Sequence, residues 1–227
     1  MKADRTSQHS AKRLEDLIEV LVRRTVQDPF SIYFVTGTDT GVGKTFVTCK
    51  LLQMLGAHKV PAVGFKPICC GDRRDAQKLW KNSGGDFDLD VVNPIHLPLP
   101  VAPMAQRNPG WSLILARVCR GIRIVRDHGI RLVLMEGAGG LLCPIAPQHT
   151  MRELARAVNA RMMVVAPDRL GVLNHTLLTV EAAGKRHVEA IVLNAMKRKS
   201  DLSRKSNARV LSRWTRLPIY SIHQETA

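Results

Sequence analysis

Acidic residues are scarce in this sequence, which has 19 Asp and Glu against 34 Lys and Arg and a formal net charge of +15 over 227 residues. Long apolar runs are absent as well, since none approaches the roughly 20 residues of a membrane-spanning helix. The first apolar positions are interrupted by acidic side chains, unlike those of a secretory signal. These absences exclude an integral membrane protein, and we expect a cytoplasmic protein with no membrane partner.

Cysteine is sparse, and the five cysteines lack the Cys-x-x-Cys spacing of zinc sites. Their odd number gives no disulfide framework, so reduced thiols in a cytoplasm are the simplest interpretation. Aromatic residues are missing from the basic stretch between Lys185 and Trp214, and no base-reading motif is visible. The charge pattern therefore favours a solvated basic surface, and we expect no nucleic-acid partner.

The stretch GTDTGVGKT at residues 37–45 is the most informative in the chain. The apolar, β-branched residues 31–36 before it predict a buried strand, and residues 46–55 after it predict a helix. A strand, a glycine-containing loop ending in Gly-Lys-Thr and a helix form the context of a phosphate-binding P-loop. In such a loop, backbone N–H groups converge on a polyphosphate, Lys44 reaches the outer phosphates and the hydroxyl of Thr45 ligates Mg²⁺.

This loop departs from the generic P-loop pattern at its first glycine. The generic pattern has four residues between that glycine and Gly-Lys-[Ser/Thr], which would place a glycine at position 38. Position 38 is Thr38, and the nearest glycine is Gly37, one position early. Nucleotide binding is still the strongest prediction, because the strand, the Gly-Lys-Thr sequence and the helix all agree.

Strands and helices alternate along the rest of the chain. Further strands are predicted at residues 60–65, 131–136, 162–167, 190–193 and 217–222, and helices at residues 10–27, 72–80, 111–128, 201–214 and from residue 168 onward. The glycine- and proline-rich residues 81–110 predict a long irregular loop, of the kind that often carries function. The alternation predicts an α/β fold, a three-layer sandwich with a mostly parallel central sheet and helices on both faces.

The chain is expected to have two parts and no internal repeat. Residues 1–29 form an N-terminal extension with one amphipathic helix, whose apolar side chains recur at i, i+3, i+4, i+7 and i+8. Residues 30–227 form the P-loop domain. Packing or dimerisation is a more natural role for the extension than targeting.

Charged side chains stand at or just after two predicted strand ends. Lys66, followed by proline, ends the strand at 60–65 and is a plausible site residue in an open α/β sheet. Glu136 ends the apolar strand at 131–136, where a carboxylate can meet Mg²⁺ beside a P-loop. Asp75 begins the helix after Lys66, and the spacing leaves open whether it complements the helix dipole or contacts Mg²⁺ or water.

With these motifs in place, the chain resembles the dethiobiotin synthetase family of P-loop NTPases. The resemblance runs from Tyr33 to Asn194, and the family's own loop, GTDTxVGKT, accounts for the early glycine. Five sequence blocks carry it, in the family's order: YFVTGTDTGVGKT (33–45), GFKPICCG (64–71), VNPIHLPLPVAP (92–103), VLMEGAGG (133–140) and LGVLNHTLLTVEAA (170–183). Each block is weak alone, but the combination is specific.

The resemblance implies an ATP- and Mg²⁺-dependent ligase of biotin biosynthesis. CO₂, in equilibrium with bicarbonate, adds to one amine of 7,8-diaminononanoate to form a carbamate, whose oxygen attacks the γ-phosphate of ATP. The second amine of the resulting carbamic-phosphoric anhydride closes the ureido ring of dethiobiotin and releases phosphate. Phosphoryl transfer depends mostly on positioning and charge neutralisation, which a P-loop, a metal ion and lysines supply.

The resemblance also implies a set of site residues and a homodimer. The catalytic positions are Lys44, Thr45 and Lys66, and the metal positions are Thr45, Asp75 and Glu136. The nucleotide positions are Gly41, Val42, Gly43, Lys44, Thr45, Phe46, Asp75, Glu136, Gly137, Ala138, Gly139 and Asn194, the last for adenine. The substrate positions are Thr40, Cys70, Gly140, Leu170, Gly171 and Asn174. In the family, the loop at residues 170–174 of a second subunit contacts the carboxylate of the diamine.

Three features depart from the family pattern. Cys70 stands where Ser or Thr is usual, which replaces a hydroxyl by a weaker thiol donor. Ala195 follows Asn194 where an acidic residue is frequent, and the sequence ends soon after LPIYSIHQ, short of the usual Gly-Glu-Ile-Pro-like adenine segment. These departures concern one substrate contact and the nucleobase contacts.

Two alternatives keep the fold and change the function. A partitioning or positioning ATPase would use the basic surface on nucleic acid or membrane, but such proteins carry a second lysine within the P-loop, and residues 38–40 read Thr-Asp-Thr. A non-catalytic regulatory relative would explain Cys70 and the short C-terminus. Against it stands the retention of all the charged site residues, namely Lys44, Lys66, Asp75 and Glu136, together with Thr45.

Overall fold

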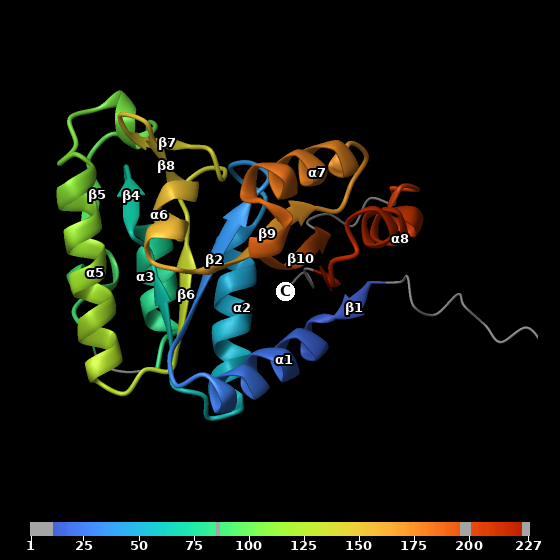
Figure 1. The fold of residues 1–227 in the computed structure, drawn as a ribbon, viewed down its shortest axis with the longest axis horizontal. Helices are drawn as coiled ribbons and strands as arrows, with labels where there is room; N and C mark the ends of the chain where they lie inside the picture. Colours follow the sequence, from blue (N-terminus) through green and yellow to red (C-terminus); the bar gives the residue numbers. More distant parts are fainter. Residues whose placement is uncertain (1–10, 85–86, 196–200, 224–227) are drawn as a thin grey trace, which may run out of the picture.

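The computed structural model describes residues 11–84, 87–195 and 201–223. The first residue of the predicted N-terminal helix and the basic residues 197–199 lie outside the described residues. Seven parallel strands form the central sheet, in the order β1-β11-β10-β9-β2-β6-β3, and helices cover both of its faces (Figure 1). The predicted α/β sandwich with a mostly parallel sheet is confirmed.

The elements follow the predicted alternation closely. The strands of the central sheet are β1 (Lys12–Arg13), β2 (Ser31–Gly37), β3 (Ala62–Phe65), β6 (Leu132–Glu136), β9 (Arg161–Pro167), β10 (Val188–Ala195) and β11 (Ile219–His223). The helices are α1 (Leu14–Gln27), α2 (Lys44–Ala57), α3 (Arg74–Lys81), α4 (Leu89–Val92), α5 (Trp111–Asp127), α6 (Met151–Ala157), α7 (Val172–Ala183) and α8 (Arg204–Thr215), with short 3-10 turns η2 (Pro103–Ala105) and η3 (Lys185–His187).

The sheet separates two hydrophobic cores. Successive side chains of a strand point to opposite faces, so a strand of continuous apolar residues needs cover on both sides. Phe34 of β2 packs in one core with buried residues of α5, α6, α7 and α8. Its neighbours Tyr33 and Val35 pack in the other core with buried residues of α1, α2 and α3. The unbroken apolar sequence of β2 therefore follows from its place at the centre of the molecule.

The N-terminal helix α1 is part of the second core. Its apolar stripe is buried against α2 and β11, through Leu14, Leu17, Ile18 and Leu21. The helix begins later than predicted because Lys12 and Arg13 form β1, which pairs with β11. The stripe is thus used in packing within the chain, while the division of the chain at residue 29 stays a prediction.

The predicted irregular loop at 81–110 contains more regular structure than expected. It holds α4, η2 and the strand β5 (Ile95–Leu97), which pairs in parallel with β4 (Ile68–Cys70) in a separate two-stranded sheet. A second small sheet is formed by β7 (Pro144–Ala146) and β8 (His149–Thr150). Strands of two or three residues are too short to show a hydrophobic period, so only the tertiary pairing reveals them.

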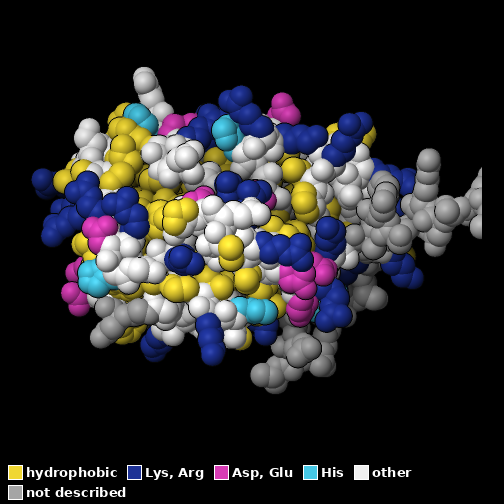
Figure 2. All heavy atoms as spheres, turned by 60° about the horizontal axis from the view of Figure 1, so that its bottom comes forward, with side chains coloured by type: hydrophobic (Ala, Val, Ile, Leu, Met, Phe, Trp, Pro, Cys, Tyr) yellow, Lys and Arg dark blue, Asp and Glu magenta, His cyan; other side chains and the backbone are white. Residues whose placement is uncertain are grey.

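The surface is broadly basic. Figure 2 shows Lys and Arg side chains scattered over one face, with few acidic side chains among them. The exposed basic residues include four arginines of α5 and three cations of α8, namely Arg117, Arg120, Arg123 and Arg126, and Lys205, Arg209 and Arg213. None of the helices in the described part of the chain combines the length and apolar character that crossing a membrane would require.

Candidate active site

Glycines shape the loop between β2 and α2. Gly41 and Gly43 have φ angles of 73° and 92°, in the left-handed region that glycine adopts without a steric penalty. At Gly37, an added Cβ would lie 2.7 Å from Cγ2 of Val42 and 2.9 Å from the carbonyl oxygen of Asp39. The early glycine is therefore required, because the loop folds back onto the end of β2 at that position.

Lys44 begins α2 and bends back over the loop. Its Nζ donates a hydrogen bond to the carbonyl oxygen of Asp39 at 3.0 Å, and the residue is only 7% exposed. Burial and the nearby charge of Lys66 lower the pKa of Lys44. An anion held by the loop and the N-terminus of α2 would offset this cost, as phosphate does at helix N-termini.

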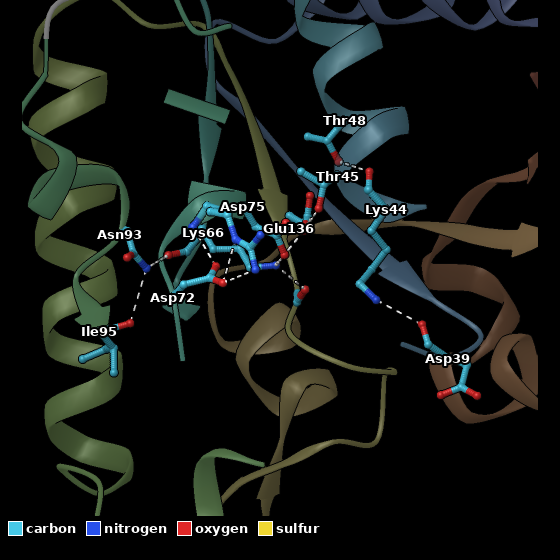
Figure 3. A network of polar contacts seen from close by, with 12 residues as sticks. Asp39, Lys44, Thr45, Thr48, Lys66, Asp72, Asp75, Asn93, Ile95 and Glu136 are labelled. Atoms are coloured by element: carbon cyan, nitrogen blue, oxygen red, sulfur yellow. Dashed lines mark hydrogen bonds and ion pairs between the residues drawn. The ribbon is translucent and has the colours of Figure 1, made fainter. Parts of the chain in front are cut away.

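A buried polar network lies beside the loop, at the carboxyl ends of β3 and β6 (Figure 3). Glu136, the last residue of β6, accepts hydrogen bonds from Nζ of Lys66 at 2.6 Å and from Oγ1 of Thr45 at 2.9 Å. Nζ of Lys66 also donates to the carbonyl oxygen of Gly137 at 3.1 Å and lies 3.7 Å from Oδ2 of Asp75. The network joins residues far apart in sequence, because the carboxyl ends of parallel strands share one edge.

Lys66 is held both by its charge partners and by its backbone. Burial alone would lower its pKa, but the carboxylates of Glu136 and Asp75 outweigh burial and raise the pKa of Lys66 above its usual value. The carbonyl oxygen of Lys66 accepts a hydrogen bond from Nδ2 of buried Asn93 at 2.7 Å, and the same amide bonds the carbonyl oxygen of Ile95 at 3.3 Å. The site therefore contains a fixed, buried ammonium group.

The donor atoms near this ammonium group fit a magnesium ion. The described residues hold no group of three or more His, Cys, Asp or Glu side chains able to bind a metal ion by themselves. Thr45, Asp75 and Glu136 nevertheless line one cavity, and Oε2 of Glu136 is buried without a hydrogen-bond partner. Since Mg²⁺ is usually bound by one or two carboxylates together with substrate phosphates, this donor set suits Mg²⁺ bound with a nucleotide.

The P-loop separates two large cavities. A cavity of 620 Å³ lies on the side of the polar network, between Lys44, Lys66 and the segment at 100–103. A cavity of 640 Å³ lies on the other side, where β9 and β10 end and α8 begins. Thr40 and Gly41 line both cavities. A nucleotide with its phosphates on the loop could thus reach into both.

Comparison with known proteins identifies the protein family of this chain. The model of a family described as AAA domain matches residues 32–222. The ATP-dependent dethiobiotin synthetase BioD of Anaeromyxobacter dehalogenans strain 2CP-C is 41% identical over 189 residues, covering 80% of this chain and 84% of that protein. The protein of the same name from Akkermansia muciniphila is 32% identical, covering 82% of this chain and 89% of that protein.

This chain belongs to the dethiobiotin synthetase family. The membership that the five sequence blocks predict is confirmed, and the partitioning-ATPase alternative is not favoured. Among solved structures, chloroplast FtsY of Physcomitrella patens is similar with a TM-score of 0.55 at 15% identity, covering 84% of this chain and 57% of that chain. FtsY of Elizabethkingia anophelis is similar with a TM-score of 0.51 at 15% identity, covering 91% of this chain and 64% of that chain. At such identity the likeness concerns the fold alone.

The structure brings most positions implied by the dethiobiotin synthetase family together. The cavity of 620 Å³ is lined by Thr40, Gly41, Gly43, Lys44, Thr45, Lys66, Cys70, Asp75, Glu136, Ala138 and Gly139. The cavity of 640 Å³ is lined by Thr40, Gly41, Val42, Leu170 and Asn194. Gly140 lines a third cavity of 280 Å³, whereas Phe46, Gly137, Gly171 and Asn174 line none of the three. The roles of all these residues stay proposals.

Several lining residues are not among the site positions that the sequence analysis predicted. Cys143 lines the cavity of 620 Å³, and Asp168, Asp201 and Arg204 line the cavity of 640 Å³. Asp168 directly follows a buried strand, which is a position where ligands bind in α/β sheets. That signal could have identified it, whereas Asp201 and Arg204 reach the site only because α8 packs against α7 and β11.

Cys70, which replaces the usual hydroxyl residue of the dethiobiotin synthetase family, carries a neutral thiol. Burial and the neighbouring Cys143 and Cys69 thiols raise the pKa of Cys70 to about 11. It can therefore donate only a weak hydrogen bond to a substrate. Cys70 lies on β4, in the wall of the cavity of 620 Å³, where a substrate could reach it.

Proposed function

We propose that this chain catalyses the ATP-dependent closure of 7,8-diaminononanoate with CO₂ to dethiobiotin, with release of ADP and phosphate. The observation that carries the proposal is the buried contact of Lys66 with Glu136 and, through it, with Thr45 of the P-loop. A phosphate-binding loop and a second, fixed ammonium group in one cavity suit the transfer of phosphate to an anionic acceptor such as a carbamate. Relatives named ATP-dependent dethiobiotin synthetase support this substrate.

The site residues have distinct roles in the proposed reaction. Backbone N–H groups of the loop and Lys44 bind the phosphates, and Thr45, Asp75 and Glu136 would hold Mg²⁺, which neutralises phosphate charge when bound. Lys66 places its ammonium group in the same cavity, where it can stabilise negative charge shared between the carbamate oxygen and the γ-phosphate. The low exposure of Lys66 and Glu136 excludes bulk water, which strengthens these interactions.

Mixing the protein with MgATP, bicarbonate and 7,8-diaminononanoate should release phosphate at a rate that depends on the diamine. Phosphate release is measured with and without the diamine, and dethiobiotin is detected by mass spectrometry. Omission of bicarbonate from degassed buffer should also suppress release, since the carbamate is then not formed. Equal rates of phosphate release with and without the diamine would overturn the proposed function.

We also propose that the chain forms a homodimer through the surface around the start of α7. Leu170 is 81% exposed and Leu178 60% exposed, and Leu142, after β6, is 50% exposed. Leu142 and Leu178 line the cavity of 280 Å³, Leu170 lines the cavity of 640 Å³, and His175 lines both. Neighbouring leucines exposed to this extent are typical of an interface. This arrangement would bring the loop at 170–174 of one subunit to the substrate site of the other.

Sedimentation velocity should give the mass of a dimer at micromolar concentration. A Leu170→Asp variant should sediment as a monomer, because a charge would then be desolvated at the interface. Val26→Asp is the matched control, since Val26 of α1 is 79% exposed and lines none of the three cavities. A wild-type monomer at all concentrations would contradict the proposal.

A further inference from the structure

Lys66 lies at a junction where the chain leaves the central sheet. The pairing of β3 with β6 ends at Phe65, and the pairing of β4 with β5 begins at Ile68. Lys66 and Pro67, the two residues between, belong to neither strand, and proline has no backbone N–H to donate. Because the ladder of the central sheet stops one residue earlier, other groups have to hold the backbone of Lys66.

The segment 92–93, at the end of α4, holds this backbone. The backbone N–H of Lys66 donates to the carbonyl oxygen of Val92 at 2.8 Å. Nδ2 of Asn93 donates to the carbonyl oxygens of Lys66 at 2.7 Å and Ile95 at 3.3 Å (Figure 3). Asn93 is only 1% exposed, so little water competes for these bonds. Two consecutive residues therefore bind both backbone groups of Lys66.

Arg73 fixes the orientation of the Asn93 amide. Nε of Arg73 donates to Oδ1 of Asn93 at 2.8 Å, and its guanidinium also donates to the backbone carbonyl oxygen of Asn93 at 3.2 Å. Since a guanidinium only donates and carbonyl oxygens only accept, these contacts settle which amide atom is oxygen and which is nitrogen. An ion pair of 2.7 Å with Asp90 of α4 also holds the guanidinium.

The same contacts connect Asn93 to a second residue of the polar network. Arg73 directly precedes α3, and the second residue of α3 is Asp75. The carboxylate of Asp75 lies 3.7 Å from Nζ of Lys66. One amide is thus bonded to Lys66 through Nδ2 and to the start of α3 through Oδ1. It joins the ammonium group and a neighbouring carboxylate, which come from different elements.

We propose that Asn93 is a positioning residue for the reaction. Its amide keeps Lys66 at the place where the ammonium group stabilises the charge of the transferred phosphate. Asn93 lines none of the three cavities, so it acts through Lys66 and does not touch a substrate. The inference rests on the proposed function, and it adds a residue outside the cavity to the machinery of that function.

Asn93→Asp tests the inference, because it removes both N–H donors but keeps the shape of the side chain and an acceptor for Arg73. The kcat for diamine-dependent phosphate release should fall about tenfold to a hundredfold, the effect of displacing a catalytic group by about 1 Å. The KM for ATP should stay unchanged, since the P-loop makes none of these contacts. Steady-state kinetics measures both, and an unchanged kcat would overturn the inference.

The same substitution in a Lys66→Met background separates positioning from a general weakening of the fold. The ammonium group is absent there, so Asn93→Asp should lower the residual kcat by no more than about twofold. A fall as large as in the wild type would mean that Asn93 does not act through Lys66.

Thr215→Val is the matched control for a lost buried hydrogen bond. Thr215 is 3% exposed, and its hydroxyl donates to the carbonyl oxygen of Leu211 at 2.7 Å within α8. This variant should lower the urea midpoint of unfolding but leave kcat unchanged. A kcat reduced as much as in Asn93→Asp would show that any lost buried bond has this effect, and would overturn the inference.

A measurement without turnover keeps the inference testable if the wild type shows no diamine-dependent phosphate release. Asn93→Asp is introduced into the wild type and into Lys66→Met/Glu136→Gln, which lacks one charge of each sign. The substitution should lower the urea midpoint more in the wild type, where it also weakens the ion pair of Lys66 and Glu136. Equal shifts in the two backgrounds would overturn the inference, whatever the activity of the wild type.

Arg73→Met is the milder variant if Asn93→Asp does not fold. The side chain of Arg73 is 22% exposed, and its loss frees Oδ1 of Asn93 but leaves both N–H donors in place. The kcat should fall by about twofold to tenfold, in line with the loss of one hydrogen bond, and the KM for ATP should not change. An Arg73→Met enzyme with the kcat of the wild type would contradict the proposed chain of contacts.

Discussion

Replacing Lys66 by methionine should lower kcat for diamine-dependent phosphate release by about 10²–10³, the usual cost of removing one electrostatic stabiliser from a closed site. The physical reason is that Lys66 supplies a buried, fixed positive charge where phosphate is transferred. ATP affinity should change little, because the loop N–H groups and Lys44 remain. Steady-state kinetics with varied ATP and diamine measures both quantities.

Two further variants separate the charge of Lys66 from its position. Lys66→Arg keeps a cation against Glu136 but moves its donors, and it should stay strongly impaired because the guanidinium is larger and planar. Lys78→Met removes an exposed lysine of α3 and should be fully active. A Lys66→Met enzyme with normal kcat and a raised KM for ATP would contradict the proposed role, since that pattern indicates uniform binding.

Replacing Glu136 by glutamine should lower the free energy of unfolding at pH 7 by about 3–5 kcal/mol, the cost of leaving one partner of a buried ion pair uncompensated. Glu136 is fully buried, and its Oε1 accepts from both Lys66 and Thr45. Glutamine preserves the shape of the side chain and removes only its charge. Urea denaturation of the wild type and the variant gives the difference.

This loss of stability should shrink as the pH rises. The pKa of Lys66 is raised in the folded protein, so the ion pair stabilises fully below the usual lysine pKa and is lost as the pH passes the raised value. In Glu136→Gln, only the half-exposed carboxylate of Asp75 remains near Lys66. Burial should then lower the pKa of Lys66 relative to the wild type, so the variant loses this charge at a lower pH. The two unfolding free energies should therefore converge in alkaline buffer.

A double variant completes the argument. Lys66→Met combined with Glu136→Gln removes both charges, and its loss of stability should be smaller than the sum of the two single losses. The double variant should still lack activity. Additive losses would mean that the contact of 2.6 Å between Nζ and Oε1 does not couple the two residues energetically.

The motif-based part of the site was predictable because its geometry is local or follows from strand ends. The Gly-Lys-Thr loop fixes Lys44 and Thr45 within one turn of α2. Glu136 could be placed beside them because the parallel strands β2 and β6 end at the same edge. For Asp75, where the spacing left two interpretations open, the structure places the carboxylate 3.7 Å from Lys66 and in the wall of the cavity.

Other parts of the site depend on which elements become neighbours. The pairing of β4 with β5 aligns Ile68 with Ile95, and the nearby amide of Asn93 holds the backbone of Lys66. No hydrophobic period marks strands of three residues. Asp168 likewise lines the cavity of 640 Å³ only because β9 lies beside β10 and Asn207 of α8 hydrogen-bonds its carboxylate.

The sequence by itself determined the alternation of strands and helices, the phosphate-binding loop and the family. These features depend on patterns of residues that are close together along the chain. Tertiary structure alone decided the order of the strands, the burial of Lys66 against Glu136 and the place of Asp168 beside Asn194. The hydrogen bonds of the site join segments 91 residues apart at Thr45 and Glu136 and 152 residues apart at Val42 and Asn194. Which distant segments meet is settled by packing on the sheet, where burial and charge pairing are satisfied together.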